Sequence, residues 1–434
     1  MKLIAGAGMT LAIIGTIILV LNQSSKITNV VFLVSALSVG TIIGRYLAYK
    51  VEMTGIPQLV SLFNAFGGMS AVIISLTEAT ISFGTPIKLL NELVLTSGAV
   101  LGAVSFSGSL IAYLKLSGVK SIKNFKVVKG LTVIVLVAIM LVSAFYFIIP
   151  DVHVPFTYFL IMVSFLSLCY GVVFSVPIGG ADMPVLVSFL NAITGVATAL
   201  AGIAFNSPIM MVGGILVGAT GVFLTLEMCN AMNRSLKTVF AGNLTKKGTV
   251  NKDNAEVIDV QFSSPVELAS ILAFSKKVGI IPGYGMAVAQ AQQVCYELQK
   301  RLMTRDVEVN YIIHPVAGRM PGHMNVLLAE ANVDYQYIKD MDEVNDTMNT
   351  FDLVLVIGAN DVVNPSAEED KDCSIYGMPI IKAYQARQVI VLKRSMSAGY
   401  SGENNPLFGR QNCKLLLGDA KDSLANTLIE LKKI

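Results

Sequence analysis

The hydrophobic pattern divides the chain into two unlike parts. Up to about residue 240, apolar runs of helix length follow one another, whereas beyond it short β-branched runs alternate with amphipathic segments. An α-helix needs about 20 apolar residues to cross the hydrocarbon core of a bilayer. The first part, residues 1–240, therefore predicts a multi-span α-helical membrane domain of about eight helices. The candidate spans are 3–22, 28–48, 58–78, 89–113, 130–149, 156–178, 184–204 and 208–230.

Charge follows the same division. Residues 1–240 hold only 6 of the 29 acidic and 12 of the 32 basic residues. Lysine and arginine concentrate in the cytoplasmic connections of membrane proteins. With the N-terminus inside, the outer connections have only Lys26 and Lys88. This bias predicts a multi-pass protein of the cell (inner) membrane with its C-terminal domain in the cytoplasm, and we find no cleavable signal peptide.

Small residues and cysteines in this pattern have structural explanations. The glycines at 213, 214, 218 and 221 and at 98 and 102 predict close helix packing in lipid. The five cysteines are scattered, with no histidine at ligand spacing, so we expect neither a metal site nor a disulfide framework.

The second part predicts an α/β domain. Residues 241–265 are polar and typical of a linker. Over 266–434, β-rich runs alternate with helix-length segments, which predicts a doubly wound, Rossmann-like parallel sheet with helices on both faces. Its ligand is expected at the carboxyl ends of the strands. The predicted strands are 278–281, 307–313, 335–338, 353–357, 389–392 and 415–417.

A glycine-rich turn follows the first predicted strand. Gly283 and Gly285 lie in Pro-Gly-Tyr-Gly-Met-Ala-Val at 282–288, and a helix is predicted over 287–303. Glycines there let backbone N–H groups approach a dinucleotide pyrophosphate, which a helix N-terminus stabilises. Val288 replaces the last glycine of the usual pattern, so a plain glycine-rich turn remains an alternative.

The choice of dinucleotide depends on the residues that meet the adenosine ribose. NAD sites usually offer an acid at the end of the second strand, but here that strand runs into His-Pro-Val-Ala-Gly-Arg at 314–319. Lys393, Arg394 and Ser395 follow the fifth strand, where two cations and a hydroxyl suit a phosphate. Both features favour NADP over NAD. A solvated surface charge pair is the alternative for Lys393 and Arg394.

These motifs resemble the β subunit of the proton-translocating NAD(P) transhydrogenase. The similarity covers nearly the whole chain and includes Gly-Gly-Ala-Asp-Met-Pro at 179–184, Ala-Met-Asn-Arg-Ser at 231–235 and the extended glycine turn at 282–292. Val-Glu-Met at 51–53 and the segments 314–319, 322–330, 356–361, 393–395 and 399–400 also match.

The resemblance implies an oxidoreductase and translocase that binds NADP(H) here and exchanges a hydride with NAD(H) on a partner α subunit. In this Re/Si-specific reaction, inward proton flow drives the hydride from NADH to NADP⁺. The family further implies a homodimer of α/β units in membrane lipid, and no nucleic-acid partner is expected. No side chain need act as an acid or base, because the two nucleotides carry the chemistry.

The resemblance also implies which residues hold the nucleotide, which lies reversed relative to ordinary Rossmann enzymes. The pyrophosphate turn would contain Gly283, Tyr284, Gly285, Met286, Ala287 and Val288. The loops after the second and fourth strands would contribute His314, Val316, Ala317, Gly318, Arg319, Met320, Pro321, Gly358, Ala359, Asn360, Asp361 and Val362. Lys393, Arg394 and Ser395 would hold the 2′-phosphate, under a lid of Met396, Ser397, Ala398, Gly399 and Tyr400. The pocket would be completed by Gly377, Met378, Asp419 and Ala420.

Polar groups within or beside the spans are the candidates for a proton path. Family positions on that path match Asp182, Asn191 and Arg234. A helix cap and a snorkelling anchor are the alternatives for Asp182 and Arg234. Where many members carry an intramembrane histidine, this chain has Asn91, so the titrating group would come from the partner, from Glu92 or from the deep Glu227. The family also usually has one more N-terminal span.

Two other classes of protein would share parts of this pattern. In a transporter or channel gated by a nucleotide-sensing domain, NADP would regulate and no hydride would move. A soluble-type NADP dehydrogenase tethered to the membrane would need a substrate domain and an acid–base pair, and the sequence offers neither.

Overall fold

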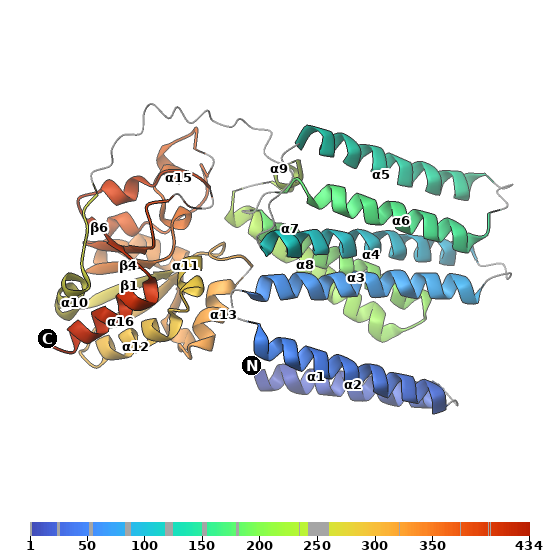
Figure 1. Cartoon of the computed structure of the whole chain (residues 1–434), viewed down its shortest axis with the longest axis horizontal. Helices are drawn as coiled ribbons and strands as arrows, with labels where there is room; N and C mark the ends of the chain where they lie inside the picture. Colours follow the sequence, from blue (N-terminus) through green and yellow to red (C-terminus); the bar gives the residue numbers. More distant parts are fainter. Residues whose placement is uncertain are drawn as a thin grey trace. The chain divides into compact units, whose positions relative to one another are not determined.

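The computed structural model describes residues 2–23, 27–51, 55–82, 88–117, 125–149, 154–178, 182–233, 235–241, 260–320, 322–373, 375–397, 399 and 401–434. The chain forms two compact units, Met1–Ile56 and Pro57–Ile434. Long helices occupy all eight predicted spans (Figure 1). They are α1 (Lys2–Gln23), α2 (Ile27–Lys50), α3 (Ile56–Ile81), α4 (Leu89–Leu116), α5 (Phe125–Ile148), α6 (Phe156–Ser175), α7 (Met183–Ala204) and α8 (Pro208–Ala231).

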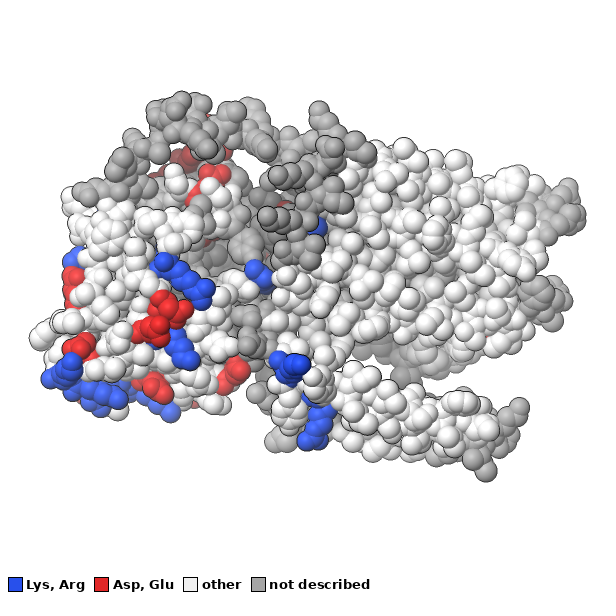
Figure 2. All heavy atoms as spheres, viewed as in Figure 1, with Lys and Arg blue, Asp and Glu red and all other residues white. Residues whose placement is uncertain are grey.

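The helices have the length and surface of membrane spans. Within the described residues, seven are long and apolar enough to cross a membrane, and α1 contributes a shorter apolar stretch, Gly6–Gly15. Large apolar side chains are exposed on the sides of these helices, among them those of Phe32, Ile134, Phe165 and Phe223. Contact between these side chains and water would be unfavourable. On the face seen in Figure 2, charged side chains gather on the sheet domain and near helix ends. The chain is therefore a multi-pass membrane protein, as the hydrophobic pattern predicts.

Glycines let neighbouring helices of the second unit approach closely. A Cβ on Gly195 of α7 would lie 2.7 Å from the Cα of Gly218 in α8. A Cβ on Gly102 of α4 would likewise lie 2.7 Å from the carbonyl oxygen of Gly68 in α3. In lipid, helices associate largely through such close packing. Lipid tails are as apolar as the helix surface, so the hydrophobic effect gives little driving force for association. The close packing predicted from the glycine-rich spans is confirmed at Gly102, Gly214 and Gly221, but it is wrong at Gly213, which has open space beside it.

We expect Gly214→Leu to destabilise this helix bundle strongly and Gly213→Leu to have little effect. A Cβ on Gly214 would lie 2.7 Å from the oxygen of Gly195 and 2.8 Å from the Cα of Ala199, and these main-chain atoms cannot move without separating α7 from α8. At the adjacent Gly213, no described heavy atom lies within 4 Å. Overpacking typically costs about 1–3 kcal/mol. Thermal unfolding in detergent should show a lower midpoint for Gly214→Leu only, and equal midpoints for the two variants would contradict this packing.

The C-terminal residues form a six-stranded, fully parallel sheet in the order β3-β2-β1-β4-β5-β6. Its strands are β1 (Lys277–Pro282), β2 (Glu308–Ile313), β3 (Ile338–Asp340), β4 (Leu353–Ile357), β5 (Val389–Lys393) and β6 (Cys413–Leu417). All five residues of β4 are buried, as in a central parallel strand covered on both faces. Chain order reverses between β1 and β4, so the Rossmann-like sheet predicted from the sequence is confirmed.

Helices and short 3₁₀ turns flank and connect these strands. The main helices are α10 (Pro265–Phe274), α12 (Gln292–Met303), α13 (His323–Glu330) and α16 (Ala420–Leu431), with the one-turn helices α14 (Met341–Val344) and α15 (Ser366–Glu369). Ser264 caps α10 by accepting a hydrogen bond from the backbone N–H of Glu267, at 3.2 Å. Just before it, Ser263 and Gln261 already pair with Leu415 of β6. Most of the expected linker, residues 242–259, lies outside the described residues.

Two predicted elements differ from the structure. The helix expected over 287–303 is two helices, α11 (Tyr284–Val288) and α12, because Gln290 adopts a left-handed φ of 50° that interrupts the hydrogen-bond ladder. The third strand begins at Ile338 instead of residue 335, since Tyr335–Tyr337 form a 3₁₀ turn. The turn after β1 is consequently followed by a helix of one turn instead of a long one.

Candidate functional site

The loops that leave the carboxyl ends of the strands enclose two adjoining cavities. The first, of about 250 Å³, is lined by Gly283, Tyr284, Val316–Arg319, Asp361, Val362 and Met378, together with Met183, Pro184, Met232, Ile375 and Ser401. The second, of about 220 Å³, is lined by Val288, Leu392–Ser395, Ser397, Gly418 and Ala420. Both share Gly285, Gly358, Ala359, Asn360 and Gly399. They therefore form one groove across the β1–β4 switch point, where parallel sheets bind ligands.

The groove collects most of the residues expected to contact a nucleotide, although some lie behind it. Met286 and Ala287 are buried beneath the turn, and Met320, Gly377 and Met396 do not line the two cavities. Sequence reasoning missed Ile375, Ser401 and Gly418, and also Met183, Pro184 and Met232 from the end segments of α7 and α8. Met183, Pro184 and Met232 lie in the motifs at 179–184 and 231–235, but only the fold shows that these motifs reach the groove. The expected residues Pro321, Ala398 and Tyr400 lie outside the described part of the chain.

The glycine turn is built by two loops that touch backbone to backbone. The N–H of Gly285 donates to the oxygen of Gly358 at 2.9 Å, and a Cβ on Gly285 would lie 2.7 Å from the Cα of Gly358. Gly358 itself has a φ of +65°, which favours glycine. Glycine is therefore required by the crossing of these loops, and the crossing leaves a floor without side chains that suits a close approach by a pyrophosphate.

Two buried histidines fix the loop after β2. His314 accepts from the N–H of Val316 on Nδ1 (3.2 Å), so its Nε2 donates to the oxygen of Pro379 (2.7 Å). His323 accepts from the N–H of Arg319 on Nδ1 (3.1 Å). Burial lowers the pKa of both imidazoles from 6.5 to about 4. Both are neutral at physiological pH, and the stability they contribute above pH 6.5 falls as the pH drops towards 4.

Arg319 closes one side of the first cavity. Its guanidinium lies over the ring of Tyr284, 4.2 Å from the ring centroid. Nη1 donates to the oxygen of Leu116, the last residue of α4, at 3.2 Å. Cations are favoured at helix C-termini because the last carbonyls have no intrahelical partner. Arg319 thus connects a side chain of the groove directly to a candidate membrane helix within the second unit.

Two cations and two hydroxyl groups line the second cavity, from Lys393, Arg394, Ser395 and Ser397. Lys393 donates from Nζ to the oxygen of Ser397 at 3.0 Å and lies over the ring of Phe408 at 4.4 Å. Burial lowers the pKa of its ammonium, an effect that the carboxylate of Asp361 opposes. Arg394 forms an ion pair with Asp419 at 3.2 Å. Lys393 is therefore a packed, half-buried cation, not a fully solvated surface charge.

The segment beyond these cations is fastened to the loop after β4. Both carboxylate oxygens of Asp361 accept hydrogen bonds from Ser401, one from its N–H at 2.9 Å and one from its hydroxyl at 2.8 Å. A Cβ on Gly399 would lie 2.7 Å from Nδ2 of Asn360. The stretch predicted to act as a lid is thus held against the floor of the groove at its glycine.

Sequence comparisons bear on the identity of this groove. The family model described as NAD(P) transhydrogenase beta subunit matches residues 1–430. The chain belongs to this family. A curated relative from Rhodospirillum rubrum, named "NAD(P) transhydrogenase subunit beta", is 41% identical over 423 residues, or 95% of this chain and 89% of the relative. The sequence from one strain of the same organism gives identical figures. The resemblance drawn from the motifs is confirmed.

In this transhydrogenase beta subunit, the polar residues expected within the spans occupy varied places. Asp182 is buried at the N-cap position of α7, without a capping hydrogen bond from its side chain. Asn191 is half-buried in α7, and Glu92 is half-buried in the first turn of α4. Asn91 is exposed in the first turn of α4, within the candidate span Leu89–Leu116. Glu227 is exposed, one turn before the end of α8 at Ala231. Arg234 lies outside the described residues.

The structure instead buries an amide that sequence reasoning missed. Asn64 of α3 is 6% exposed, and its Nδ2 donates to the hydroxyl of Ser109 in α4 at 2.9 Å. Ser61 donates to the carbonyl oxygen of Ser109 at 2.9 Å. One turn away, the hydroxyl of Ser105 hydrogen-bonds to that of Thr194 in α7. These five residues form a buried polar seam between α3, α4 and α7, and an asparagine in the middle of an apolar span is the sequence feature that could have revealed it.

Proposed function

We propose that this chain is the NADP(H)-binding subunit of a transhydrogenase, in which hydride exchange with NAD(H) on a partner α subunit is coupled to inward proton movement. The observation that carries the proposal is the groove at the β1–β4 switch point, with a glycine floor and two cations at one end. The beta-subunit family implies an α subunit as the partner. The charge bias of the connections supports a cytoplasmic C-terminal domain in the cell membrane.

The residues of the groove fit the phosphorylated form of the dinucleotide. Lys393, Arg394 and Ser395 would hold the 2′-phosphate, since ammonium, guanidinium and hydroxyl groups all donate to phosphate oxygens. The side-chain-free crossing of Gly285 and Gly358 would lie against the pyrophosphate. A phosphate bearing about two negative charges can draw Arg394 from its exposed ion pair with Asp419, because such surface pairs are weak.

The chain's own contribution to hydride transfer is positioning. The bound nicotinamides supply the hydride donor and acceptor. Val316, Ala317 and Met378 give the first cavity an apolar wall that excludes water. His314 and His323 are neutral and engaged in main-chain contacts, so they orient the loop after β2 and do not transfer protons. A reaction without side-chain acid–base catalysis suits this arrangement.

The buried polar seam would carry the proton path between α3, α4 and α7. Hydroxyl and amide groups can pass a proton along hydrogen bonds or hold water that does so, although they do not titrate themselves. Among the described residues of the helical part, Asp182 is the buried carboxylate. Met183 and Pro184, which follow it, line the first cavity. Protonation there would shift the population of groove conformations, which requires different nucleotide affinity in the two states.

Family membership also favours this function over the other classes considered. A nucleotide-gated channel or transporter would need no docking of a second nucleotide-binding subunit. A tethered dehydrogenase would need a substrate domain, whereas the described chain contains the helices and one sheet domain.

The nucleotide assignment is tested by titrating the full-length chain in detergent with NADP⁺ and, separately, NAD⁺. Each charge-assisted hydrogen bond is worth about 1.5–3 kcal/mol, so we expect NADP⁺ to bind at least about 100-fold more tightly. Equal affinity for both nucleotides would remove the role proposed for Lys393 and Arg394.

A further inference from the structure

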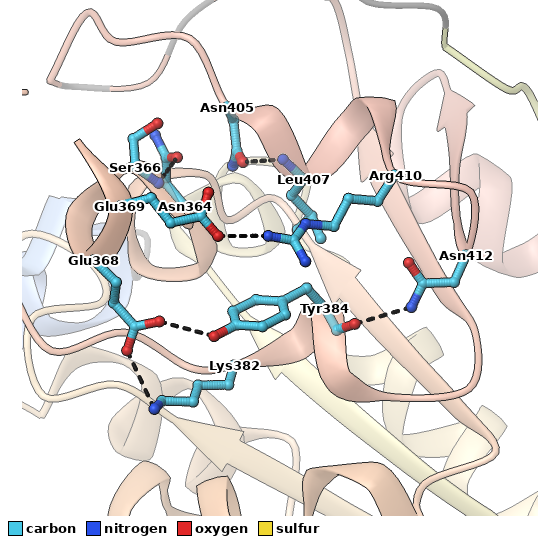
Figure 3. A network of polar contacts seen from close by, with 10 residues as sticks. All are labelled: Asn364, Ser366, Glu368, Glu369, Lys382, Tyr384, Asn405, Leu407, Arg410 and Asn412. Carbon is cyan, nitrogen blue, oxygen red and sulfur yellow. Dashed lines mark hydrogen bonds and ion pairs between the residues drawn. The ribbon is translucent and has the colours of Figure 1, made fainter.

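Asn405 joins the loop after β4 to the segment that follows the lid. Its Nδ2 donates to both the carbonyl oxygen and the Oδ1 of Asn360, each at 3.1 Å. Its Oδ1 accepts from the backbone N–H of Leu407 at 3.0 Å, a contact drawn in Figure 3. Asn405 is 3% exposed, and both its Nδ2 and its Oδ1 make their hydrogen bonds to protein atoms.

The backbone N–H of Leu407 fixes the orientation of the Asn405 amide and, through it, that of the Asn360 amide. A backbone N–H can only donate, so the Asn405 atom that meets Leu407 must be Oδ1, and Nδ2 must face Asn360. Since Nδ2 donates, it must meet the Oδ1 of Asn360, which turns the Nδ2 of Asn360 in the opposite direction. The arrangement therefore does not depend on an arbitrary choice between oxygen and nitrogen.

The Nδ2 of Asn360 lies beside Gly399, where the two cavities join. It is buried and makes no hydrogen bond to the described residues. A Cβ on Gly399 would lie 2.7 Å from it, and both Asn360 and Gly399 line the first and second cavities. An unpaired buried N–H donor is costly, and an acceptor oxygen of a ligand would satisfy it.

A second buried amide steadies the same segment. Asn364, which is fully buried, donates from Nδ2 to the oxygen of Asn404 at 3.1 Å and accepts from the N–H of Ser366 at 3.0 Å (Figure 3). The main chain beside Asn405 is thus fixed independently of Asn360. Asn405 can therefore hold the amide of Asn360 without moving itself.

We propose that Asn405 is a positioning residue that holds the Nδ2 of Asn360 towards the groove, as a donor to a phosphate oxygen of the nucleotide. Asn360 lies where the two cavities join, beside the crossing of Gly285 and Gly358, and this is the place for the pyrophosphate. The inference rests on the proposed function, because it requires a phosphorylated ligand in the groove. It adds a residue outside both cavities to the determinants of nucleotide affinity.

The test is NADP⁺ affinity of the full-length chain carrying Asn405→Leu, a neutral substitution of similar volume. Without the bond from Asn405, the amide of Asn360 can rotate and present its oxygen to the phosphate, so we expect about tenfold weaker binding. Asn412→Leu is the matched control, because Asn412 likewise donates two hydrogen bonds, both to main-chain oxygens at 3.0 and 2.8 Å, but does not line the groove. Its NADP⁺ affinity should stay within about twofold of the original chain.

A double-mutant cycle separates positioning from general loosening. Asn360→Ala should weaken NADP⁺ binding about tenfold, and adding Asn405→Leu to it should change the affinity by less than about twofold. Independent, multiplying effects would overturn the inference, as would an Asn360→Ala chain that binds as tightly as the original. An Asn360→Ala chain with unchanged NADP⁺ affinity rejects the inference even if Asn405→Leu does not fold. If the unaltered chain fails to bind NADP⁺, the proposed function is wrong, whereas unaffected binding in Asn405→Leu rejects only the positioning role.

Discussion

A chain carrying both Lys393→Met and Arg394→Gln should bind NADP⁺ at least about 100-fold more weakly than the original, with little change in its affinity for NAD⁺. Two charge-assisted hydrogen bonds to the 2′-phosphate are lost, each worth about 1.5–3 kcal/mol. The methionine keeps the apolar stem that packs on Phe408, and the exposed pair between Arg394 and Asp419 contributes little stability. Isothermal titration with both nucleotides measures the two affinities.

The control for this double variant changes the same kinds of residue elsewhere in the sheet domain. Lys414→Met and Arg387→Gln remove cations that pair with Glu267 and Asp352, and none of these four residues lines the groove. This control should keep the preference for NADP⁺. If Lys393→Met with Arg394→Gln weakened both nucleotides equally, the 2′-phosphate would have to lie elsewhere.

Asn64→Leu should reduce coupled proton movement by about tenfold or more, while NADP⁺ binding stays near its original value. Leucine has a similar volume but leaves the hydroxyl of Ser109 without its amide donor and interrupts the polar seam. Removing one partner of a buried hydrogen bond costs about 1–3 kcal/mol, which here adds to the barrier for proton transfer. Proton movement into proteoliposomes, followed with an internal pH dye, gives the measurement.

Asn91→Leu is the matched control for Asn64→Leu, because Asn91 is an exposed asparagine at the start of α4. It should leave proton movement intact. A loss at Asn91 with normal movement in Asn64→Leu would restore the position expected from the sequence and remove the buried seam from the path.

The sequence pattern was sufficient for the main elements because their signals are local. The bounds of β4 agree with the predicted strand 353–357, since a run of five apolar residues between Asp352 and Gly358 has few other interpretations. The break at Gln290 was not visible, because glutamine gives no sign of a left-handed conformation. Residues 335–338 likewise predict a strand as a short β-rich run, although Tyr335–Tyr337 form a 3₁₀ turn.

The groove was predictable only where its residues form motifs. The glycine turn, Lys393 and Arg394 follow strands directly, so topology brings them to the same edge. Asn64 and Asn405 act through partners 45 residues apart in each case, and no local pattern encodes such contacts. Their amides became candidates only when the fold showed which atoms are buried and which direction each one faces.

Coupling of hydride transfer to proton movement is tested most directly by placing the chain and an α subunit in proteoliposomes and following hydride transfer from NADH to NADP⁺ together with the internal pH. We expect each transfer to be accompanied by proton movement across the membrane, and an imposed proton gradient of the favourable direction to accelerate transfer. Hydride transfer that proceeds at the same rate with and without the gradient, and with no change in internal pH, would contradict it.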